Sequence, residues 1–203
     1  IYNAKGVFSD TIHLSNKGLR GSGTLKYLSS ETVSNDFLFT PDSTSAKVRN
    51  YQLAKVAGQV EFPEAMVKEG SIKWLPASNV MTVNNSKKEK FNLFGNKALL
   101  DGSLLLSPSG LKGKGLLAFD NAEVRSNTYN FKTDAFTSDT ADFKLLTPDK
   151  KEEALRVHVF KTAIDFASRQ GHFTATGAGA LMEFPVIKYN CVVDEFDWLM
   201  DKN

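Results

Sequence analysis

The sequence predicts an all-β fold that is elongated and built from two related modules. Residues 18–53 align without a gap with residues 110–145, each position matching the one 92 residues later. Both segments alternate apolar and polar residues with a period of two, which is typical of half-buried strands. The chain also holds 15 Phe against 5 Tyr and 2 Trp, and aromatic side chains favour a pleated surface over a helix.

The matched positions predict which side of each strand faces the core. Ile12 and Leu14 match Leu104 and Leu106, which predicts a strand before each copy. Within the copies, certain pairs are apolar in both and are separated by variable neighbours. These pairs are Leu25 with Leu117, Tyr27 with Phe119, Phe37 with Tyr129, Phe39 with Phe131, Tyr51 with Phe143, and Leu53 with Leu145.

Three glycines in each copy form the pattern Gly-Leu-x-Gly-x-Gly. They are Gly18, Gly21 and Gly23 in the first copy and Gly110, Gly113 and Gly115 in the second. We interpret the pattern as a turn followed by the start of a strand, where glycine permits a positive φ or a close backbone approach. A phosphate-binding loop is disfavoured, because no Lys-Ser/Thr follows and the next segment alternates as a strand.

Short polar segments separate the predicted strands. Ser34-Asn35 and the matching Ser126-Asn127 are predicted to be turn residues that hydrogen-bond their own backbone, and Asp42 and Asp134 are also assigned to turns. Helix is scarce: residues 63–67 could form a single turn. Residues 152–169 fit a helix or strands, and we favour strands because residues 173–176 would pair across a turn at 168–171.

The module is longer than the clear match. Glu61-Phe62-Pro63 recurs as Glu183-Phe184-Pro185, and each is followed by a tryptophan, Trp74 or Trp198. We therefore expect a first β module over 1–97 and a second over 98–203, the second with an insertion of about 30 residues near 148–178. A β-solenoid, an open β-jellyroll or taco, and two small sandwiches all remain open.

No catalytic or metal-binding pattern stands out, and we expect no enzyme activity, metal or cofactor. His13, His158 and His172 have no second ligand at a recognised metal spacing, and His13 matches Leu105. Cys191 is the single cysteine, which excludes a disulfide within the chain. The acidic clusters at 152–153 and 194–197 do not define the carboxylate pair of a glycosidase, so a polysaccharide-acting enzyme is the least favoured alternative.

Composition excludes some partners. The net charge of +2 comes from well-mixed charges, whereas nucleic-acid binding requires a clustered basic stripe. The basic run at 87–90 is interpreted as a solvated turn. No apolar run is long enough for a membrane-spanning helix. The chain begins at Ile1 inside patterned sequence, and we expect a segment of a longer protein.

The phrases GLRGSGTLKYLSSETVSNDFLFTPDS and GLKGKGLLAFDNAEVRSNTYNFKTDAF carry a resemblance. They resemble segments of large, uncharacterised envelope proteins of Bacteroides-type Gram-negative bacteria and, more loosely, the OstA-like and AsmA/TamB-like β-taco families. The resemblance implies short strands stacked edge to edge in a larger array, in the periplasm or at the cell surface.

We therefore expect a non-catalytic structural or interaction segment of a larger cell-envelope protein, with further β modules of the same parent chain as partners. The alternative is a β module that binds lipid or glycan. A lipid would require an unfilled apolar groove. A glycan would require Trp74 or Trp198 as exposed stacking platforms; the other interpretation is that each tryptophan plugs the open end of its module.

Overall fold

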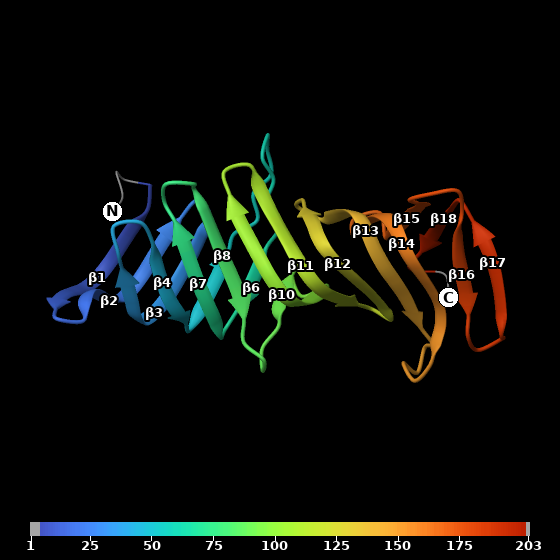
Figure 1. The fold of residues 1–203 in the computed structure, drawn as a ribbon, viewed down its shortest axis with the longest axis horizontal. Helices are drawn as coiled ribbons and strands as arrows, with labels where there is room; N and C mark the ends of the chain where they lie inside the picture. The colour runs from blue at the N-terminus through green and yellow to red at the C-terminus, as the bar shows by residue number, and fades with distance from the viewer. Residues whose placement is uncertain (1–4, 202–203) are drawn as a thin grey trace.

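The computed structural model describes residues 5–201, and every regular element in that part of the chain is a β-strand (Figure 1). The 18 strands form one sheet in which all pairings are antiparallel. The molecule is drawn out along the direction in which the strands succeed one another, from blue to red in Figure 1. The prediction of an elongated all-β fold is confirmed. Within the described residues, no helix has the length and apolar character needed to cross a membrane.

The sheet is folded lengthwise into two layers. β3 (Ser30–Phe39) pairs through its first half with β5 (Asn50–Leu53) and through its second half with β4 (Thr44–Val48). β10 (Ala98–Ser107) does the same with β9 (Phe91–Leu93) and β8 (Val80–Asn85). Each long strand therefore runs from one layer into the other.

Short strands occupy one layer each. Layer 1 contains β4, β7 (Gly70–Leu75), β8, β15 (Gln170–Ala175) and β18 (Glu195–Leu199). Layer 2 contains β5, β6 (Ala65–Val67), β9, β16 (Ala180–Phe184) and β17 (Tyr189–Val193). The long strands that cross both layers are β3 and β10 together with β1 (Val7–Ser15), β2 (Gly18–Tyr27), β11 (Gly110–Phe119), β12 (Ala122–Phe131), β13 (Ala135–Leu146) and β14 (Glu153–Asp165).

We call each long strand, and each pair of short strands that together extend over both layers, a crossing. Eight long strands and five pairs of short ones make up the crossings, and each crossing lies beside the one that precedes it in the chain. The first crossing is β1 and the last is β17 with β18. These two are the edges of the sheet, at opposite ends of the molecule (Figure 1).

The strands bend along one line, which we call the crease and define by Asp10, Gly23, Ser34, Gly115 and Ser126. At the crease the pairing register shifts, between Gly21 and Gly23 and between Gly113 and Gly115. Gly23 and Gly115 have φ of +151° and +131°, and a Cβ on either would lie 2.1 Å from a carbonyl oxygen of the adjacent strand. Glycine is required there because the two strand backbones approach too closely for any side chain.

The glycine pattern is only partly the turn that the sequence predicts. Gly18 and Gly110 begin β2 and β11 directly after tight turns, as predicted. Gly23 and Gly115 instead lie inside the strands, at the crease. The pattern therefore marks both the start of a strand and the place where that strand bends.

The prediction of turns at Ser34-Asn35 and Ser126-Asn127 is wrong. Both pairs lie inside strands, β3 and β12, at the crease. The predicted bonds to the local backbone are present: the Oγ of Ser34 accepts from the N–H of Asp36, and the Oγ of Ser126 accepts from the N–H of Thr128, both at 3.0 Å. A bend frees such N–H groups from the ladder, and a buried serine satisfies them.

Two other local predictions are resolved. Residues 63–67 form no helical turn, because Ala65–Val67 is β6 and pairs with β5. Residues 153–165 are strand β14, as favoured, and β14 pairs with β15, with Asp165 opposite Gln170. The turn between them covers residues 166–169, two residues before the predicted 168–171.

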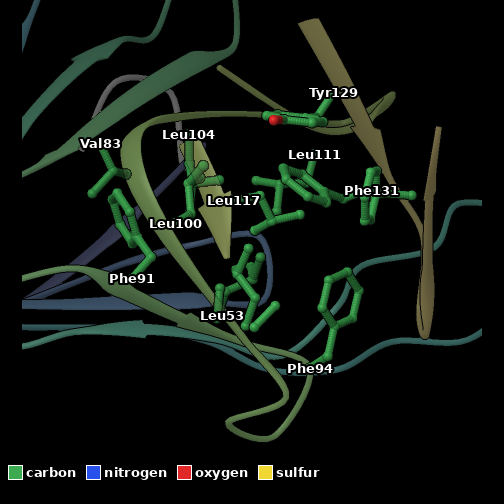
Figure 2. Close-up of a cluster of buried hydrophobic side chains, with 14 of the residues drawn as sticks. Leu53, Val83, Phe91, Phe94, Leu100, Leu104, Leu111, Leu117, Tyr129 and Phe131 are labelled. Atoms are coloured by element: carbon green, nitrogen blue, oxygen red, sulfur yellow. The ribbon is translucent and has the colours of Figure 1, made fainter. Parts of the chain in front are cut away.

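Apolar side chains from both layers fill the space between them. Tyr27 of layer 2 meets Trp74 of layer 1 with ring centroids 4.9 Å apart, and Phe143 of layer 2 meets Phe173 of layer 1 at 4.5 Å. Figure 2 shows part of this core, in which leucine, valine and aromatic side chains from several strands point toward one another. The inward residues predicted for both copies are buried apart from Leu145, which is partly buried.

The sheet continues without a break from residue 97 to residue 98, because β8 and β9 both pair with β10. Residues 148–178 contribute β14 and β15 to the sheet. β14 occupies the place beside β13 that β6 and β7 occupy beside β5 and β4. Val157 lies opposite Phe143, and in the first copy Val67 lies opposite the matching Tyr51. The division into modules at residue 97 stays a prediction.

Candidate functional site

The two tryptophans lie between the layers, Trp74 on β7 in the N-terminal half of the sheet and Trp198 on β18 at its C-terminal edge. Trp74 on β7 is fully buried against Tyr27, so its ring offers no face to a ligand in solvent. Trp198 on β18 is partly buried, with its ring 5.3 Å from Phe143 and 5.9 Å from Phe119. Ligand stacking on Trp198 stays a prediction.

The strand ends and the turns that join them lie on the side of the sheet opposite the crease, which we call the turn side. Contacts between the two layers close this side. The Tyr27 hydroxyl donates to the carbonyl of Asn79 at 2.6 Å, and Lys55 forms an ion pair with Asp134 at 2.6 Å. Arg169 contacts Asp120 at 3.3 Å. These contacts, with the packed aromatic core behind them, occupy the side on which an open taco would admit a lipid.

Glu61 adds a further contact on the turn side. Its carboxylate accepts hydrogen bonds from both the backbone N–H and the hydroxyl of Thr133. These bonds stabilise the ionised form and hold the pKa of Glu61 below its usual range. The loop that carries Glu61, between β5 and β6, is thereby fastened to the connection between β12 and β13.

The strongest candidate for a functional surface is the edge of the sheet at β1. β1 and β10 match at the offset of 92 and pair alike with the next strand: Ile12 faces Gly21 where Leu104 faces Gly113, and Leu14 faces Leu19 where Leu106 faces Leu111. Their burial differs sharply, as Leu104 and Leu106 are both 0% exposed whereas Ile12 is 46% and Leu14 is 81% exposed.

The difference has a simple cause. β10 has β8 and β9 on its other side, and β1 has no second neighbour among the described strands. Core-type side chains of β1 therefore remain in water. An uncovered apolar inner face beside an unpaired strand edge is the usual form of a surface that another strand covers.

Apolar side chains are also exposed at the opposite end of the sheet. Val192 on β17 is 70% exposed, and its cross-strand neighbour Leu181 is 51% exposed. Ile187, in the turn between β16 and β17, is 69% exposed. Cys191 lies on the inner side of β17, opposite Met182, and is partly buried. Val192 and Leu181, next to Cys191 and Met182 in their strands, therefore point outward, unlike the exposed inner residues of β1.

Two histidines form pairs with carboxylates on the outer faces of the sheet. His172 Nδ1 lies 2.7 Å from Asp197 Oδ1, and His172 Nε2 lies 3.2 Å from the hydroxyl of Thr174. The order hydroxyl, imidazole, carboxylate is that of a nucleophilic triad. However, the side chains of His172 and Asp197 are 53% and 75% exposed, and such chemistry depends on a site from which water is excluded.

This histidine cluster was missed by sequence reasoning, because His172 and Asp197 meet only through the pairing of β15 with β18. The one local signal is the spacing of His172 and Thr174, which puts both on one face of a strand. A shallow hollow of about 480 Å³ adjoins the cluster, and His172, Asp197 and Gln170 contribute to its lining. His158 forms a similar exposed pair with Asp142, at 3.1 Å.

A row of alternating charges crosses the outer face of layer 2. Lys144 pairs with Glu153, and Arg156 pairs with Glu183 with Nε and Oε2 2.6 Å apart. The pKa of Glu183 is held below its usual range, chiefly by the hydrogen bond from Arg156. Cross-strand pairs of opposite charge such as these support strand pairing.

Within residues 5–201, no three His, Cys, Asp or Glu side chains are grouped as ligands of a metal ion would be. No protein-family model, curated protein or solved structure matches the chain. The geometry of the sheet and its ends is therefore what a functional assignment depends on.

Proposed function

We propose that this chain is a non-catalytic structural or interaction segment of a larger cell-envelope protein, in which β modules are joined end to end. One observation carries the proposal: Ile12 and Leu14 are exposed on β1, while the matching Leu104 and Leu106 are fully buried on β10. The same positions of the same pattern serve as core wherever a neighbouring strand is present.

The shape supports this function. The sheet can be extended at either edge without disturbing its interior, because each crossing contacts mainly its immediate neighbours. The placement in the periplasm or at the cell surface of a Gram-negative bacterium rests on the resemblance of the two glycine-containing phrases. It is part of the proposal.

The test is the sequence of the gene on both sides of the segment that encodes residues 1–203. The proposal expects further copies of the pattern Gly-Leu-x-Gly-x-Gly, followed by alternating apolar residues at the spacing found here. A gene that encodes these residues alone would contradict it.

Native mass spectrometry of the purified chain separates this function from lipid or glycan binding. We expect the mass of the bare polypeptide. A co-purified lipid or sugar would favour the binding module instead.

A further inference from the structure

We propose that the free edge of β1 pairs with an antiparallel strand from a neighbouring β module, in the register by which β8 and β9 pair with β10. This inference rests on the proposed function and names the partner of its N-terminal edge. The partner is defined by its chemistry: a strand that crosses both layers, with large apolar residues at alternate inner positions.

The register follows from the match between β1 and β10. On β10, Leu104 faces Val83, Leu106 faces Met81 and Leu100 faces Phe91. The matching residues of β1 are Ile12, Leu14 and Phe8. The partner strand therefore carries two medium-sized apolar residues over Leu14 and Ile12 in layer 1. It carries an aromatic residue over Phe8 in layer 2.

The crease adds a polar requirement. The side chain of Asn85, at the end of β8, accepts a hydrogen bond from the N–H of Gly102 at 2.9 Å and donates to Asp101 at 3.0 Å. The residues of β1 that match Asp101 and Gly102 are Ser9 and Asp10. We expect a side chain that both donates and accepts, such as asparagine, at this point of the partner strand.

Strand direction argues against a head-to-tail stack of identical chains. β1 runs from layer 2 into layer 1, since Val7 faces Lys26 and Ser15 faces Gly18. The last crossing runs the same way, from β17 in layer 2 to β18 in layer 1. Stacking one chain on the next would create a parallel junction, whereas every strand pairing in this sheet is antiparallel.

Charge argues against two copies of β1 pairing about a two-fold axis. The two sheets could continue one another only if their creases coincide. That arrangement brings Asp10 of both chains together, and like charges directly opposite each other destabilise a strand pair. A strand of the β8 and β9 type has neither defect.

The experiment uses the whole chain with one added strand. Residues 1–5 are replaced by a second copy of residues 76–97, joined directly to Gly6, because Lys97 precedes Ala98, which matches Gly6. The control extension is identical except that Met81→Ser, Val83→Ser, Phe91→Ser and Leu93→Ser are made in the added copy. Amide hydrogen exchange of β1 is then followed by mass spectrometry in both variants and in the unmodified chain.

We expect exchange across Val7–Ser15 to slow by at least about tenfold with the apolar extension and to be unchanged with the serine extension. Equal exchange in the two extended variants would overturn the inference. In case an extended variant fails to fold, a synthetic peptide of residues 76–97 is added to the intact chain. Protection confined to β1 then supports the inference, and protection elsewhere or nowhere overturns it.

Sedimentation of the unmodified chain over a range of concentrations is the remaining measurement. A dimer that protects β1 would make a second copy the occupant and would overturn the choice of partner. Failure here is distinguishable from failure of the proposed function. The gene sequence decides whether further modules exist, whereas the extension decides whether β1 accepts such a strand.

Discussion

Replacing the matched leucines Leu14 and Leu106 by alanine would measure what a neighbouring strand contributes. Both face the inside of layer 1, and both lie opposite a leucine of the next strand. Leu106 is 0% exposed, so Leu106→Ala should cost about 3 to 4 kcal/mol of unfolding free energy, from lost burial together with the cavity left behind. Leu14 is 81% exposed, and burying about one fifth of a leucine is worth only about 0.5 kcal/mol.

The assay is urea unfolding of the two variants beside the unmodified chain, followed by tryptophan fluorescence and by circular dichroism. A loss of this size at Leu106 should also lower the melting temperature by about 10 °C, against about 1 °C for Leu14. Large losses of similar size at both positions would refute the reasoning, because they would mean that β1 is covered in solution. Small losses of similar size would instead show that the interior at β10 is loosely packed.

Three further predictions concern the crease and the outer surface. Gly115→Ala should destabilise the chain by about 3 kcal/mol or more, because the added Cβ would lie 2.1 Å from a carbonyl oxygen. The matched control is Gly177→Ala, where nothing lies within 4 Å of the added Cβ. The urea midpoint should fall for Gly115→Ala and stay unchanged for the control. Asp10 has φ of 97°, so Asp10→Gly should stabilise by about 1 kcal/mol; no gain in melting temperature would count against backbone strain at that position. The hydrogen bond from Arg156 lowers the pKa of Glu183, so the ion pair stabilises the folded chain above the ordinary carboxyl pKa of 4.5, and this stabilisation is lost as the pH falls below that value. Glu183→Gln should therefore flatten the dependence of stability on pH in that range. An unaltered profile of urea midpoint against pH would refute this.

The sequence predicts strands and inward residues well, because a period of two reports directly on which side of a strand is buried. It predicts less about how the strands are arranged. Ser30, Thr32 and Ser34 are inward in layer 2, while Phe37 and Phe39 are inward in layer 1. The alternation of inward and outward residues on each side of the bend can be seen in the sequence. The sequence does not show that the strand passes from one layer to the other between them.

A signal for the crease was nevertheless present. The inward positions of β3 change from even to odd numbers between Ser34 and Phe37, and those of β12 change in the same way between Ser126 and Tyr129. One extra residue inserted into a strand is the mark of a bulge. The polar pairs at these points suggested turns because serine and asparagine serve both purposes.

The candidate site was beyond the reach of sequence alone. Ile12 and Leu14 look like core residues, and in the second copy the same positions are core. Their exposure depends on which strand lacks a neighbour, and pairing at the edge of a sheet leaves no local pattern. The contact of His172 with Asp197 was likewise unpredictable, since 25 residues separate them.

The alternation of crossings between the two layers also governs how such a protein can change its length. Neighbouring strands lie about 4.8 Å apart, so the 13 crossings described here span roughly 60 Å, and each added hairpin would lengthen the molecule by about 10 Å at constant cross-section. Gain or loss of a hairpin preserves the direction of every following strand. Gain or loss of one strand reverses them all. Evolution of this architecture should therefore proceed in pairs of strands, and lengths in related chains should differ by even numbers of crossings.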